Sequence, residues 1–140
     1  MNYGEFLSSF LIDLQRLFRI ELSTEELTYG QTLAIISIPN DGIEMSDFSL
    51  LLGLDNSTVT RLIIRLENKN WVMRKKSKRD KRAIKVFLTD DGAEVQVGID
   101  KKLDAIGEKI NLNINEDKKD NLFDSLSLFQ WTLKTIFLKE

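Results

Sequence analysis

The residues best suited to chemistry in this sequence are hydroxyls and arginines along one predicted helix. Steps of one, three and four separate Ser57, Thr58, Arg61 and Arg65, and Thr60 lies among them. Because residues three or four apart share a helix face, one hydroxyl and both arginines would point the same way. Hydroxyls bond phosphates or base edges, arginine bonds guanine through two hydrogen bonds, and a helix N-terminus presents free N–H groups to phosphate. These residues predict recognition of a polyanion.

A concentrated basic segment overlaps this helix. The window 61–85 holds eleven basic and two acidic residues, a net charge of +9, whereas the rest of the chain holds nine basic and twenty acidic residues, a net charge of −11. An acidic body with one such segment is typical of a protein that meets a polyanion through one face, although a solvated hairpin can have the same composition. Its candidate contact residues are Lys78, Arg79, Asp80, Lys81 and Arg82. We expect Asp80 to hold Arg79 or Arg82 in an extended pose through a local ion pair.

Several classes of function are excluded by what the composition lacks. The sequence contains no Cys and no His, which excludes disulfides, Cys/His zinc sites and His-dependent catalytic triads. It shows no paired acids and no glycine-rich phosphate loop, so we predict no catalytic residue, no metal, no cofactor and no enzyme activity. No apolar run approaches the roughly 18 residues of a membrane helix, and the N-terminus lacks the basic region of a signal peptide. We therefore expect a cytoplasmic protein that has no membrane partner.

Apolar periodicity predicts the helices in the first part of the chain. Residues 5–20 repeat apolar side chains in the i, i+3, i+4, i+7 rhythm of an amphipathic helix. Thr28 and Gln31 are placed for a capping box that opens a second helix, which the turn residues 39–42 stop. A third helix is predicted over about 46–52. Its expected inward residues are Phe48, Leu51 and Leu52.

A fourth helix and a hairpin follow. The helix is predicted to begin near Asn56 or Ser57 and to end by Asn70, a residue type that tolerates the left-handed conformation. Its inward stripe is Val59, Leu62, Ile63 and Leu66. Residues 71–75 and 83–88 are rich in aromatic and β-branched types and read as two strands. The basic residues between them would form the tip of a β-hairpin.

Two long helices are predicted after the hairpin. Thr89 is a good N-cap for the first, and the acids that follow it suit the helix dipole. The apolar stripe of this helix is Gly92, Val95, Ile99, Leu103, Ile106 and Ile110. The run 113–115 interrupts it, and Asn115 is placed to cap a last helix. The expected fold is mostly α with a small β-hairpin wing.

The order of these elements predicts a winged helix-turn-helix. A helix over 44–52, a tight turn at 53–55, a helix over 56–69 and a basic hairpin follow one another. In this arrangement the second helix enters the major groove of duplex DNA as the recognition helix. The basic wing approaches the minor groove, where narrow A·T-rich DNA attracts arginine.

Four runs of residues resemble one family of bacterial and archaeal transcription regulators, the MarR family. They are Phe48–Leu62, Arg65–Val72, Arg79–Ala83 and Leu88–Gly92. The resemblance implies operator DNA as the partner, a homodimer, and in many members a small effector bound between the dimerisation and DNA-binding regions. Ser49 and Asn70 stand where the family usually has Ala and Gly. Ser is small and Asn tolerates a left-handed backbone, so neither conflicts with the fold.

The resemblance covers nearly the whole chain and implies a domain layout. We expect one MarR-like domain over 1–140, with the winged helix-turn-helix over 28–90 and dimerisation helices over 1–22 and 91–140. The two ends of the chain carry Phe6, Phe10, Phe18, Phe123, Phe129, Trp131 and Phe137. Burial of these rings within one chain is one interpretation. Pairing of the ends of two chains is favoured, because a two-fold dimer places two recognition helices about one DNA turn, roughly 34 Å, apart.

A second class of function stays open on the sequence alone. Winged helices also serve as modules that bind protein or RNA without operator specificity. Such a module would bind duplex DNA weakly and without sequence preference.

Overall fold

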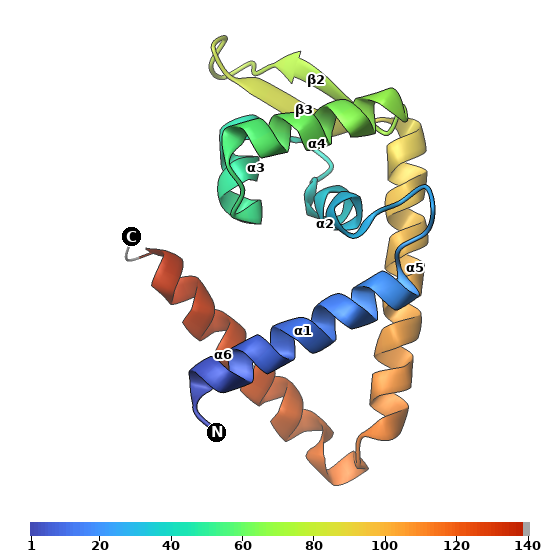
Figure 1. Cartoon of the computed structure of the whole chain (residues 1–140), viewed down its shortest axis with the longest axis vertical. Coiled ribbons are helices and arrows are strands. Elements are labelled where there is room, and N and C mark those ends of the chain that lie inside the picture. Colours follow the sequence, from blue (N-terminus) through green and yellow to red (C-terminus); the bar gives the residue numbers. More distant parts are fainter. Residues whose placement is uncertain (139–140) are drawn as a thin grey trace. The chain divides into compact units, whose positions relative to one another are not determined.

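The computed structural model of the chain describes residues 1–138 (Figure 1). Its contacts form two compact units, one over Met1–Leu103 and one from Asp104 onward. The elements are α1 (Tyr3–Glu21), α2 (Tyr29–Ser37), β1 (Ile43–Glu44), α3 (Met45–Leu52), α4 (Asn56–Asn68), β2 (Val72–Lys76), β3 (Ile84–Leu88), α5 (Asp90–Asn113), the 3₁₀ turn η1 (Glu116–Lys118) and α6 (Lys119–Leu138). The mostly helical fold with a wing is confirmed.

Local signals in the sequence set most of the helix ends. The Thr28 side chain accepts a hydrogen bond from the backbone N–H of Gln31, and the Gln31 side chain accepts one from Thr28 in return, so the predicted capping box is confirmed. Gly53 ends α3 with a φ of 67°, and Asn70 follows α4 with a φ of 63°. Both chain reversals predicted for these positions are present, and they flank α4 on either side.

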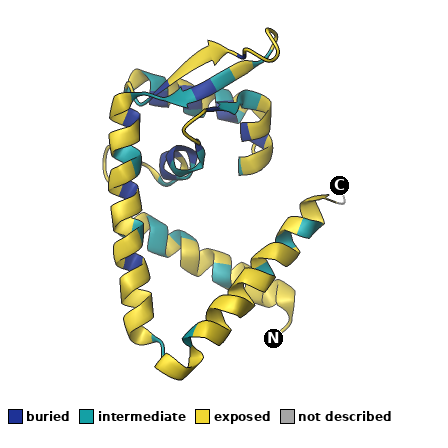
Figure 2. Cartoon of the chain, turned by 180° about the vertical axis from the view of Figure 1, so that it is seen from behind, coloured by how far each residue is buried: buried dark blue, intermediate teal, exposed yellow. Residues whose placement is uncertain are grey.

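The core of the first unit lies where α2, α3 and α4 meet the sheet (Figure 2). Phe48 of α3, Ile63 and Leu66 of α4, and Val86 of β3 are fully buried. Val59 and Ile63 confirm the predicted stripe of α4. This core holds α4 against the body along one face and leaves the opposite face in solvent.

The predicted inward position of Leu51 is wrong. Leu51 is 60% exposed, and Ser49 is buried instead. The Ser49 hydroxyl lies within hydrogen-bonding distance of the Met45 carbonyl (3.1 Å) and the Asn56 side-chain oxygen (3.0 Å). Phe48 and Ser49 together define the buried side of this short helix, and Leu51 lies outside that side.

The sheet has one strand more than the predicted hairpin. Its order is β1-β3-β2, with all neighbours antiparallel, and β1 pairs Ile43 with Val86 and Glu44 with Lys85. A two-residue strand is too short to show an alternating pattern, so the sequence did not reveal it. Its effect is to hold β3 in the centre of the sheet, which anchors the base of the wing.

The start of α5 is attached to the same core. Thr89 Oγ1 accepts a hydrogen bond from the Gly92 N–H at 3.0 Å, which confirms the predicted cap. The Gln96 side chain donates to the carbonyls of Ile35 (2.9 Å), in the last turn of α2, and of Ile38 (3.0 Å), just beyond the end of the helix. Along α5, Ile99 and Ile106 are buried as predicted, whereas Ile110 is half exposed.

The second unit comprises the end of α5, η1 and α6. Asn115 stands at the N-cap of η1 but makes no side-chain cap hydrogen bond. The expectation that it caps the last helix is therefore wrong, because the 3₁₀ turn intervenes and α6 begins at Lys119. Within the described residues α6 has no buried side chain. None of the helices in residues 1–138 has the length and apolarity needed to cross a membrane.

Candidate nucleic-acid interface

Asp55 organises the first turn of α4. One of its carboxylate oxygens accepts hydrogen bonds from the Ser57 hydroxyl and the Thr58 backbone N–H, both at 2.7 Å. The other accepts from the Thr58 hydroxyl at 2.9 Å. The bond from Ser57, followed by those from Thr58 and the charge of Arg61, lowers the pKa of Asp55 to about 2. Asp55 is therefore an anion at neutral pH.

This cap changes what the predicted hydroxyls can do. The hydrogens of the Ser57 and Thr58 hydroxyls point at Asp55, and Thr58 Oγ1 also accepts from the Arg61 guanidinium at 3.3 Å. Their remaining lone pairs make both hydroxyls acceptors toward any further partner. The Thr58 N–H is used as well, so the expected set of free N–H groups at this helix end is reduced by the capping carboxylate.

The other predicted residues of α4 divide between two faces. Arg61 and Arg65 are exposed, one helical turn apart, and share a face with Ser57. Thr60 is half-buried, and its hydroxyl donates to the Asn56 carbonyl at 2.8 Å. Thr60 therefore lies on the side of α4 that faces the sheet.

The wing tip is a hydrogen-bonded turn. The Ser77 N–H donates to the Ala83 carbonyl at 2.9 Å and the Ala83 N–H donates to the Asp80 carbonyl at 3.0 Å. The Asp80 carboxylate accepts from the Arg82 backbone N–H at 3.0 Å. The expected ion pair between Asp80 and an arginine side chain is wrong, because this carboxylate shapes the backbone instead. Lys78, Arg79, Lys81 and Arg82 are all exposed.

One groove brings α4 and the wing together. It has a volume of about 320 Å³, and its lining includes Asn56 and Thr60 of α4 together with Arg74, Arg82 and Ala83 of the hairpin. Arg74 is held there by an ion pair with Glu67 of α4, at 2.9 Å. The structure therefore brings Thr60 and Arg82 to one surface.

The remaining wing cations do not all lie on this surface. Lys78 and Arg79 line a different pocket, together with Lys75, Lys85 and Phe87. Successive strand residues point to opposite faces of a sheet, so Arg74 and Lys75 belong to opposite sides of the hairpin. The predicted set of contact residues is divided between the two sides.

One basic residue of the segment is turned toward the body. The Lys69 ammonium donates to the Glu26 carbonyl and to the Gln31 side chain, the latter at 3.0 Å, and lies 4.7 Å from the centre of the Trp71 ring. This lysine ties the end of α4 to the start of α2. Its charge belongs to the scaffold rather than to the exposed surface.

Sequence reasoning assigned no role to Asp55, Asn56 or Arg74. Asp55 precedes the helix at an N-cap position, three residues before Thr58, so the preference for Asp at N-caps could have identified it. Arg74 required the pairing of β2 with α4 and had no local signal. Within residues 1–138 no cluster of three or more carboxylates forms that could hold a metal ion.

Comparisons with known proteins agree with this geometry. A sequence model of the MarR family matches residues 27–84. The HTH-type transcriptional regulator SarZ of Staphylococcus haemolyticus is 33% identical over 108 residues, which cover 75% of this chain and 71% of SarZ. TtmR of Methylorubrum extorquens, another HTH-type transcriptional regulator, is 31% identical over 113 residues, which cover 80% of this chain and 57% of TtmR.

A solved structure shows the same fold at low sequence identity. Streptococcus pneumoniae FabT, solved in complex with DNA, superposes with a TM-score of 0.79 and 21% identity, covering 95% of this chain and 96% of FabT. This likeness concerns the fold alone. The family match and the SarZ relationship, taken with the winged helix-turn-helix geometry, show that this chain belongs to the MarR family of transcriptional regulators, which are non-enzymatic DNA-binding proteins.

Proposed function

We propose that the chain binds operator DNA as a homodimer, with α4 in the major groove and the wing tip at the minor groove. The observation that carries this proposal is the groove that Thr60 of α4 and Arg82 of the wing line together. A helix and a hairpin tip on one surface can follow the two neighbouring grooves of a duplex. FabT was solved in complex with DNA, and this chain has the same fold.

The residues of α4 have distinct parts in this proposal. Arg61 and Arg65 extend from the exposed face and can donate to guanine or to phosphate oxygens. Ser57 and Thr58 keep their hydroxyl hydrogens on Asp55, so they favour base edges that carry an amino donor, as adenine and cytosine do. The charge of Asp55 itself disfavours a phosphate at the start of the helix.

The wing contributes mainly charge. Arg82 lies at the wing tip and lines the groove shared with α4, and we assign it to the minor groove. Lys81 is exposed at the tip beside it. Lys78 and Arg79 line the other pocket, and we assign them to the DNA backbone that flanks this contact.

Exposed apolar side chains at both ends of the chain support the dimer. In the single chain Phe123, Trp131 and Phe137 of α6 are 72%, 61% and 71% exposed, and Ile12 of α1 is 65% exposed. Patches of this kind mark interaction surfaces, and a second copy offers the same apolar helices in return.

A salt titration tests the DNA proposal. Polarisation with a labelled duplex from the upstream region of the gene should give an affinity whose logarithm falls linearly with the logarithm of salt concentration, by about 0.9 for each phosphate contacted. A shuffled duplex and an RNA of the same sequence should bind more weakly. Equal affinity for all three, or no dependence on salt, would refute operator recognition.

The small effector that the family resemblance implies stays a prediction. The same titration can test for an effector, because a molecule that acts as one should change the operator affinity when it is added.

A further inference from the structure

Asn56, the first residue of α4, carries an amide that is held by the protein core. The residue is exposed and lines the groove between α4 and the wing, together with Arg82. Its side-chain oxygen lies 3.0 Å from the hydroxyl of Ser49 on α3, a residue that is only 7% exposed. A buried side chain thus fixes the orientation of an exposed one, at the surface that we propose to face DNA.

The chemistry of this contact decides which end of the amide is free. An amide oxygen only accepts hydrogen bonds, so the Ser49 hydroxyl donates to Asn56 Oδ1. The oxygen and the nitrogen of an amide point in different directions from the same carbon, and the bond to Ser49 turns the oxygen toward the body. Within residues 1–138 the Asn56 amide nitrogen has no hydrogen-bond partner. Asn56 therefore presents two N–H donors to the groove and keeps its acceptor on Ser49.

The first turn of α4 places this donor for a base rather than for the DNA backbone. The Thr60 hydroxyl donates to the Asn56 backbone carbonyl at 2.8 Å, which holds the residue within the helix. The neighbouring cap residue Asp55 is an anion at neutral pH and disfavours a phosphate at this position. In a helix-turn-helix, the N-terminal residues of the recognition helix contact base edges.

A donor and an acceptor select different bases in the major groove. An asparagine that binds adenine uses both ends of its amide, because the oxygen accepts from N6 and the nitrogen donates to N7. Guanine presents two acceptors, N7 and O6, and no donor at that edge, whereas thymine presents one acceptor and cytosine a donor. An amide that presents only its nitrogen therefore favours guanine, since the amino groups of adenine and cytosine would meet another donor.

We propose that Asn56 determines specificity for a guanine in the operator, and that Ser49 is the positioning residue that makes its amide a donor. The inference rests on the proposed binding of operator DNA by α4. Without the Ser49 hydroxyl, the Asn56 oxygen is free to turn to the groove. The amide can then form the contact with adenine that uses two hydrogen bonds.

Selection of binding sites from a library of random duplexes tests this proposal with the full-length protein. The wild type should recover sequences with a guanine at one position of each half-site. Asn56→Ala should lose this preference and keep those at other positions. In polarisation assays with duplexes that differ at this base pair alone, the wild type should bind guanine about tenfold more tightly than adenine. A loss of affinity in Asn56→Ala that is equal for all duplexes would show a phosphate contact and overturn the proposal.

The role of Ser49 is measured by base preference rather than by affinity. Ser49→Ala should shift the ratio of the guanine and adenine affinities about tenfold toward adenine. In the Asn56→Ala background the same substitution should leave base preference unchanged, whereas a purely structural role would lower affinity in both backgrounds. Urea unfolding checks that each variant is folded. A wild-type preference in Ser49→Ala would contradict the positioning role.

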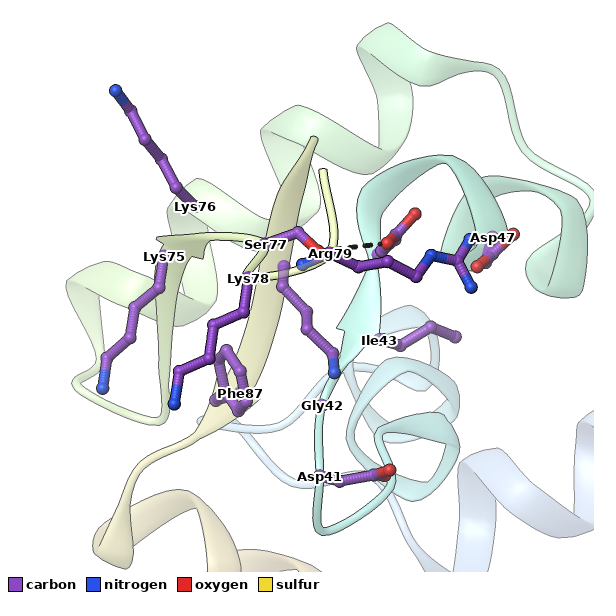
Figure 3. Close-up of a pocket in the computed structure, with 12 residues that line it drawn as sticks. Asp41, Gly42, Ile43, Asp47, Lys75, Lys76, Ser77, Lys78, Arg79 and Phe87 are labelled. Carbon is purple, nitrogen blue, oxygen red and sulfur yellow. Dashed lines mark hydrogen bonds between the residues drawn. The ribbon is translucent and has the colours of Figure 1, made fainter. Parts of the chain in front are cut away.

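Two control variants separate this contact from general effects on binding. Ser46 is an exposed serine of α3 that lines the same groove without bonding Asn56, so Ser46→Ala should keep the preference for guanine. Lys78 lies beside Phe87 in a pocket that Asn56 does not line (Figure 3), and Lys78→Gln should weaken binding to all duplexes by the same factor. Loss of the guanine preference in either control would show that it does not depend on Asn56.

The selection also distinguishes this inference from the proposed function. A wild type that recovers no common sequence would refute operator recognition and, with it, the role of Asn56. A wild type that recovers an operator which Asn56→Ala selects equally well would refute the role of Asn56 alone.

Discussion

Substitution of Arg82 is the most direct test of the proposed contact between the wing and DNA. It is exposed, and it lines the groove shared with α4. Its backbone N–H is held by Asp80, so the position of the residue is defined even though its side chain is free to extend. A cation at such a position contributes both charge and position to minor-groove binding.

Arg82→Ala should weaken operator binding by roughly 1–3 kcal/mol and lower the slope of the salt dependence by about 1. Polarisation at two salt concentrations measures both, and circular dichroism checks that the fold is kept. Lys69→Ala is the control, because Lys69 belongs to the same basic segment but is bonded to Glu26 and Gln31. Unchanged affinity in Arg82→Ala, or an equal loss of slope in both variants, would contradict the role of the wing.

Asp55 shows how one carboxylate links helix stability to pH. Its pKa is lowered to about 2, first by the hydrogen bond from Ser57 and then by those from Thr58. A group whose pKa is lower in the folded state stabilises that state above its unfolded value, near 3.8, and loses this contribution as the pH falls toward the folded value.

Asp55→Ala should therefore lower the urea midpoint of unfolding by a constant amount from pH 7 down to about pH 4. Below pH 4 the difference from the wild type should shrink. Urea unfolding at several pH values measures this. Asp100→Ala, at an exposed position within α5, should show no such pH-dependent difference. A deficit in Asp55→Ala that stays the same at pH 3 would argue against the charged cap.

At the scale of elements, the junction between the wing and α5 explains the run Leu88–Gly92. Thr89 donates its hydroxyl to the Asn70 carbonyl at 2.6 Å and its backbone N–H to the Trp71 carbonyl at 3.0 Å. Gly92 sits against Trp71 so closely that a Cβ would overlap the carbonyl oxygen of Trp71. This glycine lets the first turn of α5 contact the chain that leaves α4.

Gly92→Ala should destabilise the protein by about 3 kcal/mol, because the overlapped atoms are backbone and cannot turn away as a side chain would. Gly98→Ala, on the same helix with open space around its Cβ position, should stabilise it by about 0.5–1 kcal/mol. Urea unfolding of both variants measures the change in the free energy of unfolding, which should be a loss for Gly92→Ala and a gain for Gly98→Ala. A neutral Gly92→Ala would mean that α5 does not approach Trp71 this closely.

Elements differ in how far the sequence predicts them. The capping box at Thr28 and Gln31, the left-handed Asn70 and the Thr89 cap were predictable, since each depends on neighbours a few residues away. The outward position of Leu51 and the strand β1 were not. Both are decided by packing partners distant in sequence, which local periodicity does not contain.

At the scale of the whole molecule, the exposed apolar surface of the end helices argues for self-association. The second unit has little to bury its own apolar side chains against, since α6 carries no buried residue. The expected layout, with dimerisation helices over 1–22 and 91–140, stays a prediction. The boundary between the two compact units, at Leu103, lies within α5 and is defined by the contacts within a single chain.

Light scattering at micromolar concentration should report a dimer for the wild type and a monomer for Trp131→Asp, because a charge at an apolar interface is costly to bury. Leu50→Asp is the control: Leu50 is 81% exposed on α3, outside the end helices, and its variant should stay dimeric. A wild type that is monomeric, or a loss of the dimer in Leu50→Asp alone, would exclude the proposed interface.

The sequence by itself determined the order of the helices and of the hairpin, the caps at Thr28 and Thr89, and the concentration of positive charge over 61–85. These features depend on residue type and on spacing within one or two helical turns. Only the tertiary structure decided which of the cations share a surface. Arg82 meets α4, Lys69 turns to the body, and Lys75 and Lys85 lie over Phe87 on the other side of the hairpin. The physical reason is that the pairing of strands and the burial of Phe48, Ile63 and Val86 set the direction of each side chain, and both join residues far apart in the chain.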